Sequence, residues 1–132
     1  MAKAKKAKEI SFTMSNRVGL LSEVTTAIAG AKVNITAICA YAMENSAYFM
    51  LTTDGNAKAK KALAPLGVLL EEGDVVEIEV PNKAGELQKV AKKLADAGID
   101  IEYMYATAAT GKTATCVFKT ADDKKTINVV NK

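Results

Sequence analysis

The chain carries the same sequence pattern twice, with an offset of 66 residues. NRVGLL at 16–21 returns as NKAGEL at 82–87. The positions that repeat at this offset are Asn16, Gly19, Leu21, Val24, Ala29, Ala31 and Ile35 in the first copy, and Asn82, Gly85, Leu87, Val90, Ala95, Ala97 and Ile101 in the second. Because one register persists through consecutive patterns of different period, it indicates an internal duplication, and the fold must be built from two similar units.

The first copy alternates between strand and helix patterns. Residues 9–14 alternate apolar and polar side chains, which is typical of a strand, and residues 20–31 place apolar side chains at helical spacing. The remaining expected elements are strands at 33–41 and 47–53 joined by a turn at 43–46, a helix at about 56–64 capped by Asp54, a short strand at 68–70, and a turn in the acidic EEGD at 71–74.

The second copy repeats this order with one extra hairpin residue. It predicts a strand at 75–80, a helix after Gly85, strands at 99–107 and 113–120, and a cap at Asp122. Residues 122–132 are ambiguous, because the repeat predicts a short helix whereas β-branched residues favour a strand locally. We follow the repeat and expect a helix. No counterpart of the 68–70 strand follows.

This order defines the fold class. Each unit reads β-α-β-β-α with a final strand in the first copy only, which predicts an α+β fold of two tandem ferredoxin-like βαββαβ modules. We expect the modules to pair side by side, since that would cover exposed sheet edges. The expected boundaries are a basic tail at 1–8, a first module at 9–72 and a truncated second module at 73–132.

Charge and residue types exclude several functions. Four of the 18 basic residues lie within residues 1–8, so the remainder holds 14 basic and 15 acidic residues and is not a basic nucleic-acid surface. We interpret the lysine-rich start as a solvated tail. Histidine is absent, which removes the commonest general base and metal ligand. We therefore expect no catalytic residues, no metal and no cofactor.

The chain shows no sign of secretion or membrane insertion. No apolar run approaches the length that crosses a bilayer, and no hydrophobic segment follows the N-terminal lysines. Cys39 and Cys116 stand alone in apolar stretches, as buried reduced cysteines do in the cytoplasm. We expect a cytoplasmic protein without membrane or nucleic-acid partners.

One segment imitates a phosphate-binding loop. ATAATGKT at 106–113 ends in Gly-Lys-Thr, but Ala106 stands where the motif requires glycine, and the loop should lead into a helix. The following TATCVFKT alternates like a strand instead. We expect a hairpin tip here.

The two repeated segments, NRVGLLSEVTTAIAGAKVNI and NKAGELQKVAKKLADAGIDI, resemble the ACT domain, and EYMYA at 102–106 adds to the likeness with small stand-alone proteins of two ACT domains. The resemblance implies binding of an amino acid or related small molecule where two domains meet. It matches Asn16 to a loop asparagine that grips the ligand, Gly19 to a glycine that lets the ligand approach, and Asn34 to a polar contact.

The resemblance carries over less completely to the second copy. There Asn82 and Gly85 match, but Asp100 replaces the asparagine at 34 and would repel a ligand carboxylate. Val18 and Ala84 occupy positions where the family often has proline. The expected ligand-binding residues are Asn16, Arg17, Val18, Gly19, Leu20, Asn34, Ile35, Asn82, Gly85 and Asp100, with the first copy as the better candidate.

The turn has a physical basis for binding that does not depend on the family. Each glycine turn opens a helix, and the first helical amides form a cradle for a carboxylate. Alternatively, Gly19 and Gly85 serve only to make a tight turn and close packing.

Three functions therefore remain to compare. The favoured one is a non-enzymatic sensor of a small molecule, in which the ligand binds at the seam between modules. The alternative is a ligand-free assembly module or regulatory subunit that dimerises or docks on a metabolic enzyme. A small enzyme is least favoured, because no base and nucleophile are arranged together.

Overall fold

The computed structural model describes residues 1–108 and 110–132. The elements are β1 (Lys3–Ser15), α1 (Leu20–Gly30), β2 (Ile35–Met43), β3 (Ser46–Thr53), α2 (Asn56–Leu63), the 3-10 helix η1 (Ala64–Leu66), β4 (Glu71–Pro81), α3 (Glu86–Asp96), β5 (Ile101–Thr107), β6 (Thr113–Thr120) and α4 (Asp123–Asn131). The chain divides into two compact units, which we call the first unit (Lys8–Gly73) and the second unit (Met1–Ala7 with Asp74–Lys132). The α+β ferredoxin-like plan in two copies is confirmed.

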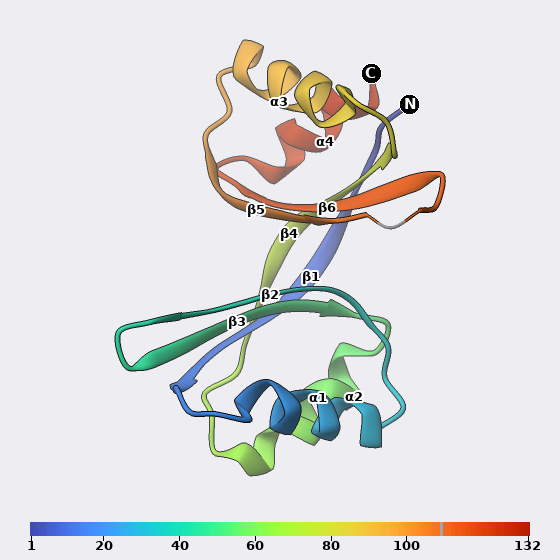
Figure 1. The fold of residues 1–132 in the computed structure, drawn as a ribbon. Coiled ribbons are helices and arrows are strands. Elements are labelled where there is room, and N and C mark those ends of the chain that lie inside the picture. Colours follow the sequence, from blue (N-terminus) through green and yellow to red (C-terminus); the bar gives the residue numbers. More distant parts are fainter. Residues whose placement is uncertain (109) are drawn as a thin grey trace. The chain divides into compact units, whose positions relative to one another are not determined.

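The first unit packs α1 and α2 on one face of its strands (Figure 1). Its strands follow the order β2-β3-β1, and β1 and β3 are antiparallel with Phe12 opposite Phe49. These two rings stack with centroids 4.9 Å apart. The alternation predicted at 9–14 is confirmed, because the apolar residues of this segment face the helices. The buried core comprises Ile10, Phe12, Met14, Leu20, Val24, Ile28, Val33, Ala47, Phe49, Leu51, Ala59 and Leu63.

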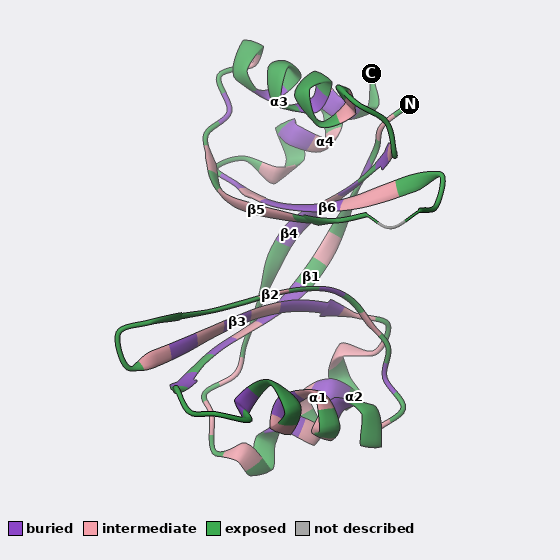
Figure 2. Cartoon of the chain, in the orientation of Figure 1, coloured by how far each residue is buried: buried purple, intermediate pink, exposed green. Residues whose placement is uncertain are grey.

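The second unit repeats this arrangement with α3 and α4 on its strands (Figure 1). Its strands follow the order β4-β6-β5, and both pairs are antiparallel. Figure 2 shows buried residues on the strands and exposed residues along much of α3. The buried core comprises Ala4, Val76, Ile78, Val80, Val90, Leu94, Ile99, Cys116, Phe118 and Val130. Burial raises the pKa of the Cys116 thiol, so this cysteine behaves as an apolar core residue.

The expectation of a solvated tail at the N-terminus is wrong. Lys3–Ser15 is one strand, and β1 lies next to β4 in the strand order. Ala4 is buried in the second unit's core, and its backbone is held by Asn131 of α4. The amide of Ala4 donates to Asn131 Oδ1 at 2.7 Å, and Asn131 Nδ2 donates to the carbonyl of Ala4 at 2.9 Å. The missing last strand of the second copy is therefore supplied by the start of the chain.

The expected strand at 68–70 and turn at 71–74 are also wrong. Residues 68–70 have no regular structure, and EEGD forms the beginning of β4. The reason is local, since η1 and the left-handed Gly67 (φ 74°) delay the start of the strand. The first unit begins at Lys8, and the main segment of the second unit begins at Asp74, 66 residues later. The repeat therefore includes parts of both long strands, β1 and β4.

The two hairpins show where the offset between the copies changes from 66 to 67 residues. The amide of Asn16 donates to the carbonyl of Asn45, and the amide of Asn82 donates to the carbonyl of Lys112. The two donors are 66 positions apart and the two acceptors 67, so the second hairpin carries one extra residue. ATAATGKT is the tip of the β5–β6 hairpin, as predicted, although Ala109 lies outside the described residues.

The last helix and the two predicted caps have different outcomes. Residues 123–131 form α4, so the prediction taken from the repeat is confirmed. Asp122 caps α4 by accepting from the amide of Lys125 at 3.0 Å. The Asp54 cap is wrong, because Gly55 occupies the N-cap of α2, and Asp54 accepts from the amide of Asn34 instead. The one-residue insertion explains this difference, since Asp122 is equivalent to Gly55 and not to Asp54.

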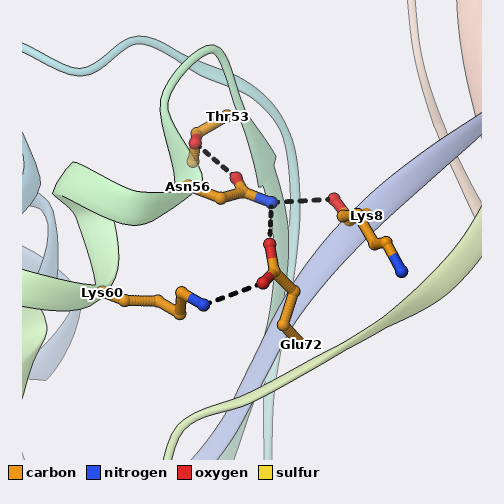
Figure 3. A network of polar contacts seen from close by, with 5 residues as sticks. All are labelled: Lys8, Thr53, Asn56, Lys60 and Glu72. Atoms are coloured by element: carbon orange, nitrogen blue, oxygen red, sulfur yellow. Dashed lines mark hydrogen bonds and ion pairs between the residues drawn. The ribbon is translucent and has the colours of Figure 1, made fainter.

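A polar network joins β1, α2 and β4 in the first unit (Figure 3). Asn56 Nδ2 donates to the Lys8 carbonyl at 3.2 Å and to the Glu72 carboxylate at 3.0 Å. Lys60 donates to Glu72 at 2.8 Å, and the Thr53 hydroxyl donates to Asn56 Oδ1 at 2.6 Å. The hydrogen bond from Lys60 and, next, that from Asn56 lower the pKa of Glu72 below its ordinary value of 4.5.

Replacing Asn131 tests the anchoring of the N-terminal strand. We expect Asn131→Ala to lower the free energy of unfolding by about 1–2 kcal/mol, because two hydrogen bonds to a partly buried backbone are lost. Amide exchange should accelerate at residues 3–7. Asn128→Ala is the matched control, since Asn128 lies exposed on the same helix. Equal exchange in both variants would show that Asn131 does not hold the strand.

The pH dependence of stability tests the Glu72 network. A carboxylate whose pKa is lower in the folded state stabilises the protein above its unfolded pKa, and this contribution disappears as the pH falls through the folded value. We expect Glu72→Gln to lower the urea midpoint at pH 7, and the difference from wild type to vanish as the pH falls below about 4. Glu71→Gln serves as the control, since its exposed carboxylate has no hydrogen bond or ion pair with the residues described. A difference that persists unchanged at pH 3 would contradict this role.

Candidate functional site

Both copies build the same glycine turn. Gly19 (φ 87°) and Gly85 (φ 86°) are the N-cap residues of α1 and α3, and no side chain caps either helix. A Cβ atom added at either glycine would meet nothing within 4 Å. Glycine is therefore required by the left-handed backbone and not by a lack of space. Of the two structural explanations, the tight turn applies and close packing does not.

A pocket of about 290 Å³ opens beside the first turn. It lies between the start of α1 and the end of β2, where the β2–β3 hairpin closes. The residues that line it are Asn16, Arg17, Gly19, Leu20, Leu21, Ala40, Tyr41, Ala42, Ala47 and Phe49. This volume is near the lower limit for small-molecule sites in proteins.

Small side chains on the helix-facing side of the strands create this hollow. Ala40 is opposite Phe49 in the β2–β3 ladder, and Ala42 is opposite Ala47. Phe49 and Ala47 belong to the core under the helices, so Ala40 and Ala42 face the same side. Because both alanines are exposed, the start of α1 does not fill the space above them.

Two polar side chains lie at the pocket. Within the described part of the chain, the side-chain amide of Asn16 has no hydrogen-bond partner, while its backbone amide is bonded to Asn45. Arg17 Nη2 pairs with Glu23 at 2.6 Å. A guanidinium carries five N–H donors, so this pairing leaves donors that can reach a ligand. The site therefore offers donors and a positive charge beside a helix N-terminus, an arrangement that suits a carboxylate.

The predicted site residues fall into two groups in this copy. Asn16, Arg17, Gly19 and Leu20 line the pocket, whereas Val18 is fully exposed on the turn and is not a lining residue. Asn34 and Ile35 lie at the opposite end of β2, about 20 Å along the strand from Tyr41. The structure thus does not bring Asn34 to the Gly19 turn within one module.

Sequence reasoning missed the floor of the pocket. Leu21, Ala40, Ala42 and Ala47 are apolar residues of ordinary strands and helices, and none has a chemically distinctive side chain. A signal was present in ICAYAM, where alternate positions carry only methyl groups at the end of a strand. Such a strand fills its helix-facing side poorly.

The second turn differs in charge and in its hydrogen bonds. Asn82 Nδ2 donates to the carbonyl of Gly111 at 3.0 Å, so this side chain holds the hairpin. Glu86 occupies the position of Leu20 and pairs with Lys89 at 2.7 Å, and this hydrogen bond lowers the pKa of Glu86. Asp100 is exposed at the start of β5. The Glu86 carboxylate at the start of α3 makes this turn less favourable for an anionic ligand.

These features agree with a defined class of protein. The family described as an ACT domain pair matches residues 6–132, so the chain belongs to that family. A search among curated proteins found no match. Among the described residues, no helix is both long and apolar enough to cross a membrane.

Solved structures share the fold over nearly the whole chain. Protein BT0572 from Bacteroides thetaiotaomicron is 33% identical with a TM-score of 0.87, covering 97% of this chain and 88% of its own. The regulatory subunit of aspartate kinase from Thermus thermophilus, in a ligand free form, is 14% identical with a TM-score of 0.71, covering 95% of this chain and 91% of its own. The similarity to the Thermus protein shows a common fold alone.

Substituting the turn glycine tests the backbone requirement. We expect Gly19→Ala to lower the free energy of unfolding by about 1–2 kcal/mol, because alanine resists a positive φ. Gly30→Ala is the control, since that glycine lies within α1 and has free space at its Cβ position. The control should be neutral or slightly stabilising. Equal effects of the two substitutions in urea unfolding would contradict the requirement.

Proposed function

We propose that this protein is a non-enzymatic regulatory module that binds an amino acid at the Gly19 turn of its first copy. The observation that supports this most is the pocket, in which Asn16, Arg17 and Gly19 of the turn meet the end of β2. Membership of the ACT domain pair family supports a regulatory ligand-binding role.

The chemistry of the pocket suits an α-carboxylate. Arg17 supplies a permanent positive charge, and Asn16 supplies an amide whose donors and acceptor are unused by the residues described. The first amides of α1 have no side-chain cap and contribute the positive end of the helix dipole. The open mouth of the pocket leaves the α-amino group in contact with water.

Binding regulates only if the ligand prefers one state of the protein. The Gly19 turn is a suitable place for this, because a ligand there contacts both the start of α1 and the end of β2. A ligand would restrain these elements relative to each other and shift the population of any partner-binding state. The Thermus relative is a regulatory subunit of aspartate kinase, and we infer that a metabolic enzyme is the kind of partner to test here. Two free cysteines fit a location in the reducing cytoplasm.

One observation favours the alternative, an assembly module. β2 is the last strand in its part of the strand order, and ITAICAYAM contains neither charge nor proline. Edge strands of sheets usually carry charged residues or proline, because an unprotected edge strand pairs with a strand of another chain. Ile38, Tyr41 and Met43 on β2 are also exposed. A second copy could pair along this edge without a ligand.

A ligand panel with matched variants tests the sensor proposal. We expect at least one of the twenty amino acids to bind in calorimetry, and Arg17→Gln to weaken it about tenfold, because a charged hydrogen bond is lost. Lys83→Gln removes the equivalent charge of the second copy and should change the Kd less than twofold. If no amino acid binds while β2 variants alter the mass in solution, the assembly alternative replaces the sensor.

A further inference from the structure

Resting on the proposed function, we propose that the Gly19 pocket selects amino acids with an aliphatic side chain, such as valine or leucine. This selectivity follows from the residues that would surround the side chain of the ligand, since the carboxylate is bound at the turn.

The walls and floor of the pocket are apolar. Leu20 and Leu21 come from α1, and the floor consists of methyl groups and the Phe49 ring. Among the described lining residues, Asn16 and Arg17 of the turn supply the polar side chains that face the pocket, and Tyr41 borders it from the strand. Tyr41 stacks on Tyr48, with centroids 5.1 Å apart, and this pair lies on the face of the strands opposite to Ala40 and Ala42.

A polar ligand side chain would lose hydration without compensation. None of the ten described lining residues is acidic, so the ammonium of a lysine side chain would have no partner. Asn16 and Arg17 belong to the turn, where the carboxylate binds, and Arg17 is already paired with Glu23. A hydroxyl or amide on that floor would be desolvated without a hydrogen bond, which is unfavourable. An aliphatic side chain instead gains from covering Ala40 and Ala42, which are otherwise exposed.

The second copy supplies an internal comparison. Ala106 is the equivalent of Ala40, and its ladder partner Cys116 stands where the first copy has Phe49, but Glu86 replaces the apolar wall of Leu20. A carboxylate in that wall opposes both a ligand carboxylate and an aliphatic side chain. The two copies therefore differ in the residues that decide selectivity, and the aliphatic site is assigned to the first copy.

Isosteric ligands test the selectivity directly. Valine and threonine have nearly the same shape, and differ by a methyl group and a hydroxyl. We expect calorimetry on the full chain to show that valine binds at least tenfold more tightly than threonine, and leucine at least tenfold more tightly than aspartate or lysine. Leucinamide, which lacks the carboxylate, should bind at least tenfold more weakly than leucine.

A pair of variants tests the location. Ala40→Leu fills the floor of the pocket at an exposed position, and Ala106→Leu makes the same change at the equivalent position of the second copy. We expect Ala40→Leu to weaken leucine binding at least tenfold and Ala106→Leu to change it less than twofold. Circular dichroism and thermal unfolding establish that both variants fold.

Each outcome has a distinct meaning. If threonine, aspartate or lysine binds as tightly as the aliphatic ligands, the selectivity is overturned and the proposed sensor function stands. If Ala40→Leu folds and binds leucine as wild type does, the assignment to this pocket is overturned. If none of the twenty amino acids binds, the selectivity fails together with the sensor function.

Discussion

The second unit of this protein depends on a strand whose residues come from the start of the chain, before the first unit. The second copy contains no last strand of its own, so its sheet would end at β4. Residues 3–7 of β1 supply that strand, bury Ala4 in the second core and bond to Asn131. An unpaired strand next to a hydrophobic core leaves backbone donors and acceptors unsatisfied, which is costly. This pairing therefore lets a truncated repeat form a complete ferredoxin-like unit.

The duplication made most of the fold predictable. One offset fixed the order of elements in both copies, and it decided that residues 123–131 are helical although their composition favours a strand. The same reasoning failed where a segment takes part in structure beyond its own copy. Residues 1–8 are predicted to be a tail because their lysines suit solvent, yet Ala4 is buried in the second unit's core and is bonded to Asn131, 127 positions away in sequence. A pattern read locally does not contain such a partner.

The candidate site was predictable only at its turn. Asn16, Arg17, Gly19 and Leu20 were found because an asparagine, a glycine turn and a helix start form a recognisable order, and these residues line the pocket. The floor was not found, since alanines are informative only when the space above them is known to be empty. The resemblance groups Asn34 with the turn at a site where two domains meet; within the first unit its backbone amide donates to Asp54 at the other end of β2, and its part in binding stays a prediction. The cap predicted at Asp54 is wrong because Gly55 occupies that position. The hollow above the alanines and the contact of Asp54 both depend on distances in space that a sequence does not contain, and the turn is the best supported part of the site.

The bond between Ala4 and Asn131 joins residues 127 positions apart, and this separation has a consequence for folding. Residues 3–7 are synthesised before the strand they join and before the helix that holds them. The second unit is completed by a contact between residues far apart in sequence, which is a slow step in folding. During that interval the strand is unpaired and exposed. Its lysines keep such an edge from pairing with other chains, so the charge that resembles a solvated tail protects a strand that waits for its partner.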